Sequence, residues 1–242
     1  RQDPYLMRNE HIFSTDVEIV LPALKSELQS IKSIWFPRSR NGDGEAGRIL
    51  ERELCVPENN RDEADIPIAD LKTATATTKT TLFSKEGKLL LPKEEIYKRF
   101  GFAGKKHPLS LQSAVNSSPN SHHFFYYCEG DGVYLRCRDV DIQFWSWDLL
   151  SHCFTSKFPA VFTVHYETKK INNVEHFKFT HAYYFPSLNS TINSFLSAFK
   201  QGNITIEVRR YMIAGKERNR GTAFRVNQQT FNQIFQTRTT II

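Results

Sequence analysis

A short acidic segment, residues 65–72 with the sequence DIPIADLK, constrains the fold of this 242-residue chain more than any other stretch. Read as a strand after a turn at Pro67, the segment alternates between two faces, so Asp70 and Lys72 share one of them. The turn would return the chain and place Asp65 beside Asp70. The segment therefore predicts that two carboxylates and one ammonium group converge at the start of a strand.

Such a group of side chains suits one kind of chemistry. Mg²⁺ is bound through one or two carboxylates, which leaves coordination positions for water and a substrate phosphate. A lysine beside it stabilises developing charge or helps to deprotonate an attacking water, which suits phosphodiester hydrolysis. Glu51, on a helix predicted over residues 45–54, adds a carboxylate one turn after Gly47, where a glycine permits close backbone approach. The alternative is that these residues form an ordinary solvated face.

The bulk composition is that of an ordinary soluble globular protein, with 40% apolar and 24% charged residues. The longest apolar runs fall short of the about 18 residues that a membrane helix needs, so we expect a cytoplasmic protein with no membrane contact. Four cysteines without a CxxC pair agree with a reducing compartment. The net charge of +6 and the pI of about 9.1 favour a polyanionic partner.

Hydrophobic periodicity and turn residues predict a mixed α/β fold. The expected helices cover residues 16–31, 45–54, 92–100 and 188–199, and residues 144–148 lead into a further helix that ends near Phe158. The expected strands cover residues 68–72, 80–84, 123–128, 133–138, 161–167, 176–185, 204–209 and 222–226. Residues 103–122 read as a long loop. Composition does not shift enough anywhere to place a domain boundary.

The last quarter of the chain predicts a basic hairpin. Glu207 and Arg209 project from one face of the first strand, residues 214–221 form a basic, flexible loop, and the second strand carries Arg225. A two-stranded ribbon fits the major groove of DNA. There, arginine donates a pair of hydrogen bonds to guanine, and a carboxylate accepts a hydrogen bond from the N4 amino group of cytosine. The alternative is a surface hairpin with local ion pairs.

Several blocks of this sequence, in order from about residue 42 to the C-terminus, resemble the MvaI/BcnI type of restriction endonuclease. These enzymes are relatives of the mismatch-repair nickase MutH within the PD-(D/E)xK nuclease superfamily. The blocks that carry the resemblance are Asp65 and residues 47–53 (GRILERE), 58–60 (ENN), 70–72 (DLK), 81–85 (TLFSK), 99–101 (RFG), 147–148 (WD), 179–180 (FT), 182–183 (AY) and 220–226 (RGTAFRV).

The resemblance implies a role for each residue of the acidic segment. Asp65 and Asp70 correspond to the metal-binding acidic pair, with a main-chain carbonyl near Leu71 as a further ligand, and Lys72 is the motif lysine. Glu51 corresponds to an additional helix carboxylate that orders the lysine, a water or a second metal. Asp70 departs from the family pattern, because these relatives usually carry glutamate there and aspartate reaches less far.

The resemblance also implies how DNA is read. Glu207, Arg209 and Arg225 match recognition positions of the MvaI branch, whereas the BcnI branch has no arginine at Arg209 and a histidine at Ala223. A CC-N-GG site with A or T at its centre is the expected target. Further DNA contacts are expected from Ser84, Lys85 and Arg220.

Together these expectations describe a Mg²⁺-dependent type II restriction endonuclease, for which Mn²⁺ is expected to substitute. We expect a single domain over residues 1–242, with a catalytic part at about 36–102 plus central strands and a recognition part at 203–235, forming two lobes around a DNA cleft. We expect a monomer that acts on double-stranded DNA and is accompanied by a cognate DNA methyltransferase. The alternatives are a MutH-like strand-specific nickase and a non-catalytic DNA-binding module of a larger defence protein.

Overall fold

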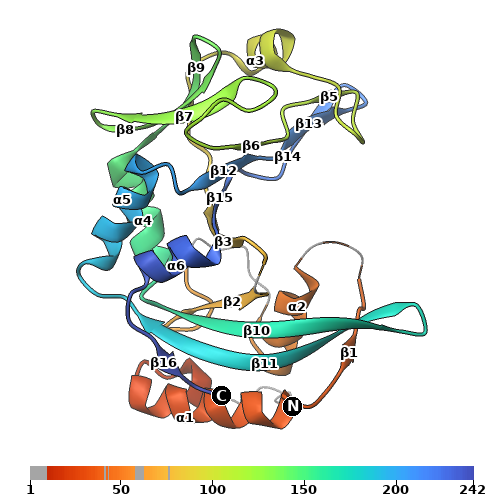
Figure 1. The fold of residues 1–242 in the computed structure, drawn as a ribbon, viewed down its shortest axis with the longest axis vertical. Coiled ribbons are helices and arrows are strands. Elements are labelled where there is room, and N and C mark those ends of the chain that lie inside the picture. The colour runs from red at the N-terminus through yellow and green to blue at the C-terminus, as the bar shows by residue number, and fades with distance from the viewer. Residues whose placement is uncertain (1–9, 41, 43, 58–62, 76) are drawn as a thin grey trace, which may run out of the picture. The chain divides into compact units, whose positions relative to one another are not determined.

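The computed structural model describes residues 10–40, 42, 44–57, 63–75 and 77–242 (Figure 1). The chain forms two compact units. The first unit comprises the described residues of 1–80, 156–188 and 235–242, and the second unit comprises residues 81–155 and 189–234. Helix α4 (Trp147–Lys157) runs from the second unit into the first. The predicted extent of one domain over the whole chain stays a prediction.

The first unit is built on a mixed five-stranded sheet with the order β1-β11-β10-β2, in which β16 also pairs with β11. Strands β10 and β2 are parallel, and the other pairs are antiparallel. The hairpin of β10 and β11 extends past the other strands of the sheet (Figure 1) and turns at Asn172 and Asn173, which both have positive φ. The strand bounds are Phe36–Pro37 (β1), Asp70–Ala74 (β2), Ala160–Ile171 (β10), Val174–Pro186 (β11) and Thr239–Thr240 (β16).

Two helices, α1 (Val17–Ile31) and α2 (Glu45–Glu53), pack into one core with this sheet, after a short 3-10 helix at Glu10–Phe13. Asp16 caps α1 by accepting a hydrogen bond from the Glu18 backbone at 2.9 Å. The apolar stripe that predicted α1 is buried, and alternate residues of β10 complete the core: Val20, Leu24, Leu28, Ala160, Phe162 and Val164. Both predicted helices are confirmed.

The second unit contains three sheets, with the strand orders β3-β15-β12-β6, β14-β13-β5 and β4-β9-β8-β7. Its own helices are α3 (Lys93–Phe100), α5 (Thr191–Lys200) and α6 (Gln228–Ile234). The strand bounds are Thr80–Ser84 (β3), Lys88–Leu89 (β4), Leu109–Ser110 (β5), Ser113–Val115 (β6), Phe124–Glu129 (β7), Gly132–Cys137 (β8), Val140–Ser146 (β9), Thr205–Val208 (β12), Arg210–Ile213 (β13), Lys216–Asn219 (β14) and Ala223–Val226 (β15).

The predicted two-stranded ribbon is wrong in one respect. Strands β12 and β15 do pair, but they are the inner strands of a four-stranded sheet. The basic segment 214–221 is not a loop, because Lys216–Asn219 forms β14 against β13. Strands β5 and β6 lie within the predicted loop of residues 103–122. These short strands escaped prediction because their partners are distant in sequence, as in the pairing of Met212 with Leu109.

A buried acidic side chain at the first residue of α2 anchors that helix. The Glu45 carboxylate, whose side chain is 1% exposed, accepts hydrogen bonds from the Ser39 backbone (2.8 Å), the Ser39 hydroxyl (2.7 Å), the Arg40 backbone (3.2 Å) and Arg48 Nη2 (2.6 Å). Burial raises the pKa of Glu45, but these hydrogen bonds outweigh it and lower the pKa to about 2. The contacts join the segment after β1 to the helix that carries Glu51.

We expect Glu45→Gln to lower the free energy of unfolding by about 3 kcal/mol at pH 7, the equivalent of this pKa difference at about 1.4 kcal/mol per pH unit. A depressed carboxyl pKa stabilises the fold above the unfolded pKa of 4.5, and the contribution is lost as pH falls toward about 2. Urea unfolding at pH 7 and pH 3 measures both values, with the exposed Glu94→Gln as control. A difference that persists unchanged at pH 3 would contradict the assignment.

Candidate active site

A tight turn places the two predicted metal-binding aspartates together. Ile66 and Ala69 exchange two backbone hydrogen bonds of 3.1 Å, which close the turn at Pro67. The Asp65 carboxylate then accepts a hydrogen bond from the Leu71 backbone at 2.9 Å. Strand β2 begins at Asp70, two residues later than predicted, because residues 66–69 are used by the turn. The predicted return of the chain at Pro67 is confirmed.

Asp70 is fully buried and lies between two lysines. Its carboxylate forms one ion pair with Lys72, on the same face of β2, and a second with Lys157, whose Nζ lies 2.7 Å from Oδ1. Neither carboxylate oxygen accepts a well-directed hydrogen bond from the described residues. The pKa of Asp70 is raised to about 6. Burial and the charge of Asp65 raise this pKa, and together they outweigh the charges of Lys72 and Lys157, which lower it.

Asp65 experiences the opposite balance. Burial raises its pKa, but the neighbouring Asp70 carboxyl, the charges of Lys157 and Lys72, and the hydrogen bond from the Leu71 backbone outweigh burial and lower the pKa. Two adjacent carboxyl groups with pKa values moved in opposite directions are a sign of strong mutual interaction. The predicted convergence of Asp65, Asp70 and Lys72 is therefore present in the first unit.

Sequence reasoning missed Lys157. This last residue of α4 has a side chain that is 13% exposed, and its Nζ lies 3.4 Å from Asp65 Oδ1 and 2.7 Å from the Glu63 carbonyl oxygen, in addition to its contact with Asp70. Burial lowers the pKa of Lys157, but the Asp70 and Asp65 charges outweigh it and raise the pKa. Nothing in the spacing of Lys157 distinguished it among the 32 basic residues of the chain.

The Lys72 side chain is half-buried and lies beside an aromatic ring. Its Nζ lies 5.7 Å from the centre of the Phe158 ring, which packs edge-on against Phe235 at 5.5 Å. In the parallel pairing of β2 with β10, the register partner of Lys72 is Thr163. The Thr163 hydroxyl is buried and has no hydrogen-bond partner among the described residues.

Glu51 lies in α2, a helix that packs against β2. A Cβ atom at Gly47 would lie 3.7 Å from the Thr73 hydroxyl, so the helix approaches the strand closely at the glycine. Leu71 belongs to the same core as the apolar residues of α2. The helix therefore packs on the face of β2 opposite to Asp70. The role of Glu51 stays a prediction, and the sequence block 58–60 lies outside the described residues.

The converging carboxylates match a hard divalent cation. No group of three or more His, Cys, Asp or Glu side chains with metal-binding geometry occurs within the described ranges. Two carboxylates converge, however, and one of them is buried with oxygens that accept no directed hydrogen bond. Mg²⁺ is held in proteins through one or two carboxylates, with water and substrate phosphate completing its shell. The residues present therefore fit such an ion.

The predicted DNA-reading residues gather in the second unit. Arg225 Nη1 lies 3.2 Å from Glu207 Oε2, between the paired strands β15 and β12. Arg209 donates to the Ser84 hydroxyl at 2.7 Å and to the Gly221 carbonyl at 2.9 Å.

Two further predicted residues join this cluster through the backbone. The Arg220 backbone donates to the Arg209 carbonyl at 3.1 Å, and the Lys85 backbone donates to the Thr222 carbonyl at 2.8 Å. Burial lowers the pKa of Arg209, Glu207 opposes this effect, and the charges of Arg225 and Arg220 add to it. The predicted DNA-contacting residues thus form one charged cluster around β3, β12 and β15, which consists of Ser84, Lys85, Glu207, Arg209, Arg220 and Arg225.

Comparison with known proteins agrees with this geometry. The model of the MvaI/BcnI restriction endonuclease family matches residues 25–235. The fold thus belongs to a type II restriction endonuclease, a site-specific deoxyribonuclease. The chain belongs to the MvaI/BcnI restriction endonuclease family, as its sequence blocks predicted.

Solved structures show the same α/β fold, which confirms the predicted fold class. The complex of restriction endonuclease MvaI with a cognate DNA substrate is 23% identical, with 92% of this chain and 98% of that chain covered and a TM-score of 0.77. MvaI in the absence of DNA is 22% identical, with 95% of this chain and 99% of that chain covered and a TM-score of 0.52. No curated protein is significantly similar. In the described part of the chain, no helix is long and apolar enough to cross a membrane.

We expect Lys157→Met to destabilise the metal-free protein by about 3 kcal/mol at pH 8, because it removes one of the two ammonium groups that compensate the buried Asp70 and the ammonium group that contacts Asp65. Denaturant unfolding in EDTA measures the loss, and Lys98→Met, on the exposed face of α3, is the control. Equal unfolding midpoints for the two variants would show that Lys157 does not hold the carboxylates.

Proposed function

We propose that this protein hydrolyses phosphodiester bonds of double-stranded DNA at a short specific site, with Asp65, Asp70 and Lys72 as its reaction centre. The observation that carries the proposal is the convergence of these three side chains beside Lys157 at the start of β2. Family membership supports the reaction class, and the similar MvaI structure contains cognate DNA.

Asp65, Asp70 and the main-chain carbonyl of Leu71 are the proposed ligands of Mg²⁺, with Mn²⁺ as a substitute. Restriction endonucleases generally use divalent metal ions. A bound ion would supply Lewis-acid stabilisation of the charge that develops on the scissile phosphate. The aspartate at position 70 serves where relatives usually have glutamate. Its shorter side chain still reaches both Lys72 and Lys157.

Lys72 is the residue that acts on the attacking water. Its ammonium group shares a face of β2 with Asp70 and is partly shielded by Phe158. From this position the ammonium group orients the water, or the neutral amine form of Lys72 accepts the proton of the water. In-line attack forms the new P–O bond and breaks the bond between phosphorus and the 3′-oxygen, which takes up a proton from solvent, so the products are a 5′-phosphate and a 3′-hydroxyl. Glu51 is the proposed additional carboxylate that orders Lys72, a water or a second ion.

Lys157 is a positioning residue in this mechanism. Adjacent carboxylates repel each other, and an ammonium group in contact with both reduces that repulsion. Its third contact, to the Glu63 carbonyl, fixes the ammonium at the segment that leads into Asp65. Lys157 thus keeps the carboxylates close together before a cation and the DNA phosphate arrive.

The charged cluster of the second unit is the proposed base-reading surface, and CC-N-GG with A or T at the centre is the proposed target. In this proposal the arginines donate hydrogen bonds to guanine, and Glu207 accepts a hydrogen bond from the N4 amino group of cytosine. Arg209 is held in place by Ser84 and Gly221, which would fix its direction toward a base. Lys85 and Arg220 add positive charge for the DNA backbone. We further propose a cytoplasmic monomer and a cognate methyltransferase in the same system.

We expect the protein to linearise unmodified plasmid DNA in Mg²⁺, and sequencing of the ends to locate the site. Asp65→Ala should reduce the cleavage rate on the order of 10³-fold or more, because several kcal/mol of charge stabilisation are lost. Asp139→Asn, at an exposed position, is the matched control.

Other outcomes of this digestion separate the alternatives. Nicking confined to one strand of hemimodified DNA would favour a MutH-like nickase. Tight, salt-dependent binding without cleavage in Mg²⁺ or Mn²⁺ would favour a non-catalytic DNA-binding module. Undiminished cleavage by Asp65→Ala would overturn the assignment of the reaction centre.

Arg225→Ala is expected to cost about 1–3 kcal/mol in transition-state stabilisation and to relax specificity at one base pair. Cleavage rates on duplexes substituted at each position of the site measure both effects. Arg218→Ala, on the exposed strand β14, is the control. Uniform weakening on every duplex would instead identify Arg225 as a phosphate contact.

A further inference from the structure

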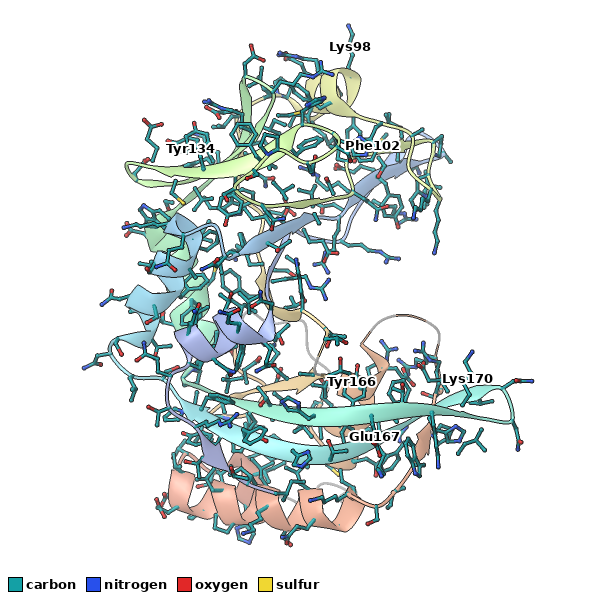
Figure 2. The ribbon with its side chains drawn as sticks, viewed as in Figure 1. Lys98, Phe102, Tyr134, Tyr166, Glu167 and Lys170 are labelled. Atoms are coloured by element: carbon teal, nitrogen blue, oxygen red, sulfur yellow. The ribbon has the colours of Figure 1, made fainter. Side chains whose placement is uncertain are left out.

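The two faces of strand β10 have different surroundings. Its residues 160, 162 and 164 are in the core, and Tyr166 packs against that core. The odd-numbered residues therefore lie on the opposite face, where Thr163 is the register partner of the catalytic Lys72. Beyond Thr163, this face continues along the projecting hairpin with His165, Glu167 and Lys169. Figure 2 labels Glu167 on this part of the hairpin.

At the outer end of this face, two lysines share one aromatic ring. Lys169 Nζ lies 4.0 Å and Lys178 Nζ 4.9 Å from the centre of the Trp35 ring. Lys178 also forms an ion pair of 2.5 Å with Glu167, its cross-strand partner. Because one carboxylate accompanies two ammonium groups, this cluster keeps a net positive charge. The indole fixes the position of the cations by cation–π attraction.

A second group lies on the same face, where Tyr183 of β11 and Lys72 of β2 are both register partners of Thr163. The rings of His165 and Tyr183 pack edge-on at 5.5 Å, and the Arg238 guanidinium lies 4.7 Å from the centre of the Tyr183 ring. His181 is the register partner of His165. Burial lowers the pKa of His165, and the nearby His181 and Arg238 add to this effect. Arg238 is the permanent cation of this group.

We infer that this face is a track for the phosphate backbone of the duplex that flanks the cleaved bond. The track consists of Lys169, Lys178, Trp35, Tyr183 and Arg238, and the inference rests on the proposed function. Its cations lie on the same face of the sheet as Lys72, on β10 (Lys169), on β11 (Lys178) and on the segment that leads into β16 (Arg238), and this row of positive charge across one face matches a polyanion. Contacts to phosphates position the duplex without reading its sequence.

The length of the track sets how much DNA it contacts. Lys169 lies six residue steps beyond Thr163, which is roughly 20 Å at about 3.3 Å per residue. That distance corresponds to about six base pairs at 3.4 Å each. A duplex that ends closer to the cleaved bond on this side would not reach Lys169.

The opposite face of the same strand offers a matched control. Lys170 follows Lys169 directly and carries the same charge, but it lies on the other face, as the register partner of Glu175. Glu175 in turn pairs with Arg38. Figure 2 labels Lys170.

The test measures the salt dependence of DNA binding for Lys169→Ala, Arg238→Ala, their double variant and Lys170→Ala. Fluorescence anisotropy with a long CC-A-GG duplex and a scrambled duplex, both in Ca²⁺ in place of Mg²⁺, supplies the dissociation constants. Each phosphate contact contributes about 0.9 to the slope of log K against log salt. We expect each single variant to reduce the slope by about one on both duplexes, the double variant by about two, and Lys170→Ala to leave it unchanged.

Two further measurements sharpen the result. First, Lys169→Arg should restore the wild-type slope. Second, the effect of Lys169→Ala should vanish when one side of the duplex is shortened to fewer than about six base pairs beyond the cleaved bond. Equal slopes for Lys169→Ala and Lys170→Ala, with the far-ultraviolet circular dichroism of both unchanged, would overturn the track. Failure of the wild-type protein to cleave plasmid would instead refute the proposed function, and the slope comparison would still test the track.

Discussion

The buried carboxylate of Asp70 is the constraint on which the site depends. A charged group with no exposed surface is costly unless it is compensated, and here two lysines compensate it from different parts of the chain. Lys72 follows on the same strand, whereas Lys157 is brought to the site by the end of α4 and the parallel pairing of β10 with β2. The sheet of the first unit therefore has to form before the acidic segment acquires its electrostatic properties.

The same sheet joins the reaction centre to a larger surface. One face of β10 completes the apolar core, and the other carries polar and charged side chains from Thr163 to Lys169. This division lets a single long strand support both the core and the proposed contact with a polyanion. In the second unit, the β3-β15-β12-β6 sheet similarly supports the cluster of Glu207, Arg209 and Arg225, because Ser84 on β3 accepts a hydrogen bond from Arg209 directly.

Local signals in the sequence were sufficient for much of this description. The stripe of α1 with its Asp16 cap, the turn at Pro67 and the alternation around Glu207 all depend on residues close together in the chain. The prediction of strands failed where a strand is stabilised by pairing with a segment that is distant in the sequence. The segment around Lys216 reads as a polar loop, yet β13 recruits it as a strand, and the short strand β5 exists because it completes the same sheet.

The sequence by itself determined the family, the mixed α/β class, the acidic pair with its lysine, and the basic, arginine-containing strands near the C-terminus. These follow from spacing along one strand or one turn, which local geometry converts directly into proximity. Only the tertiary structure brought Lys157 to Asp65 and Asp70, and only it placed Trp35 beneath Lys169 and Lys178. Those contacts join segments far apart in the chain, so they arise from the pairing of strands and the packing of helices.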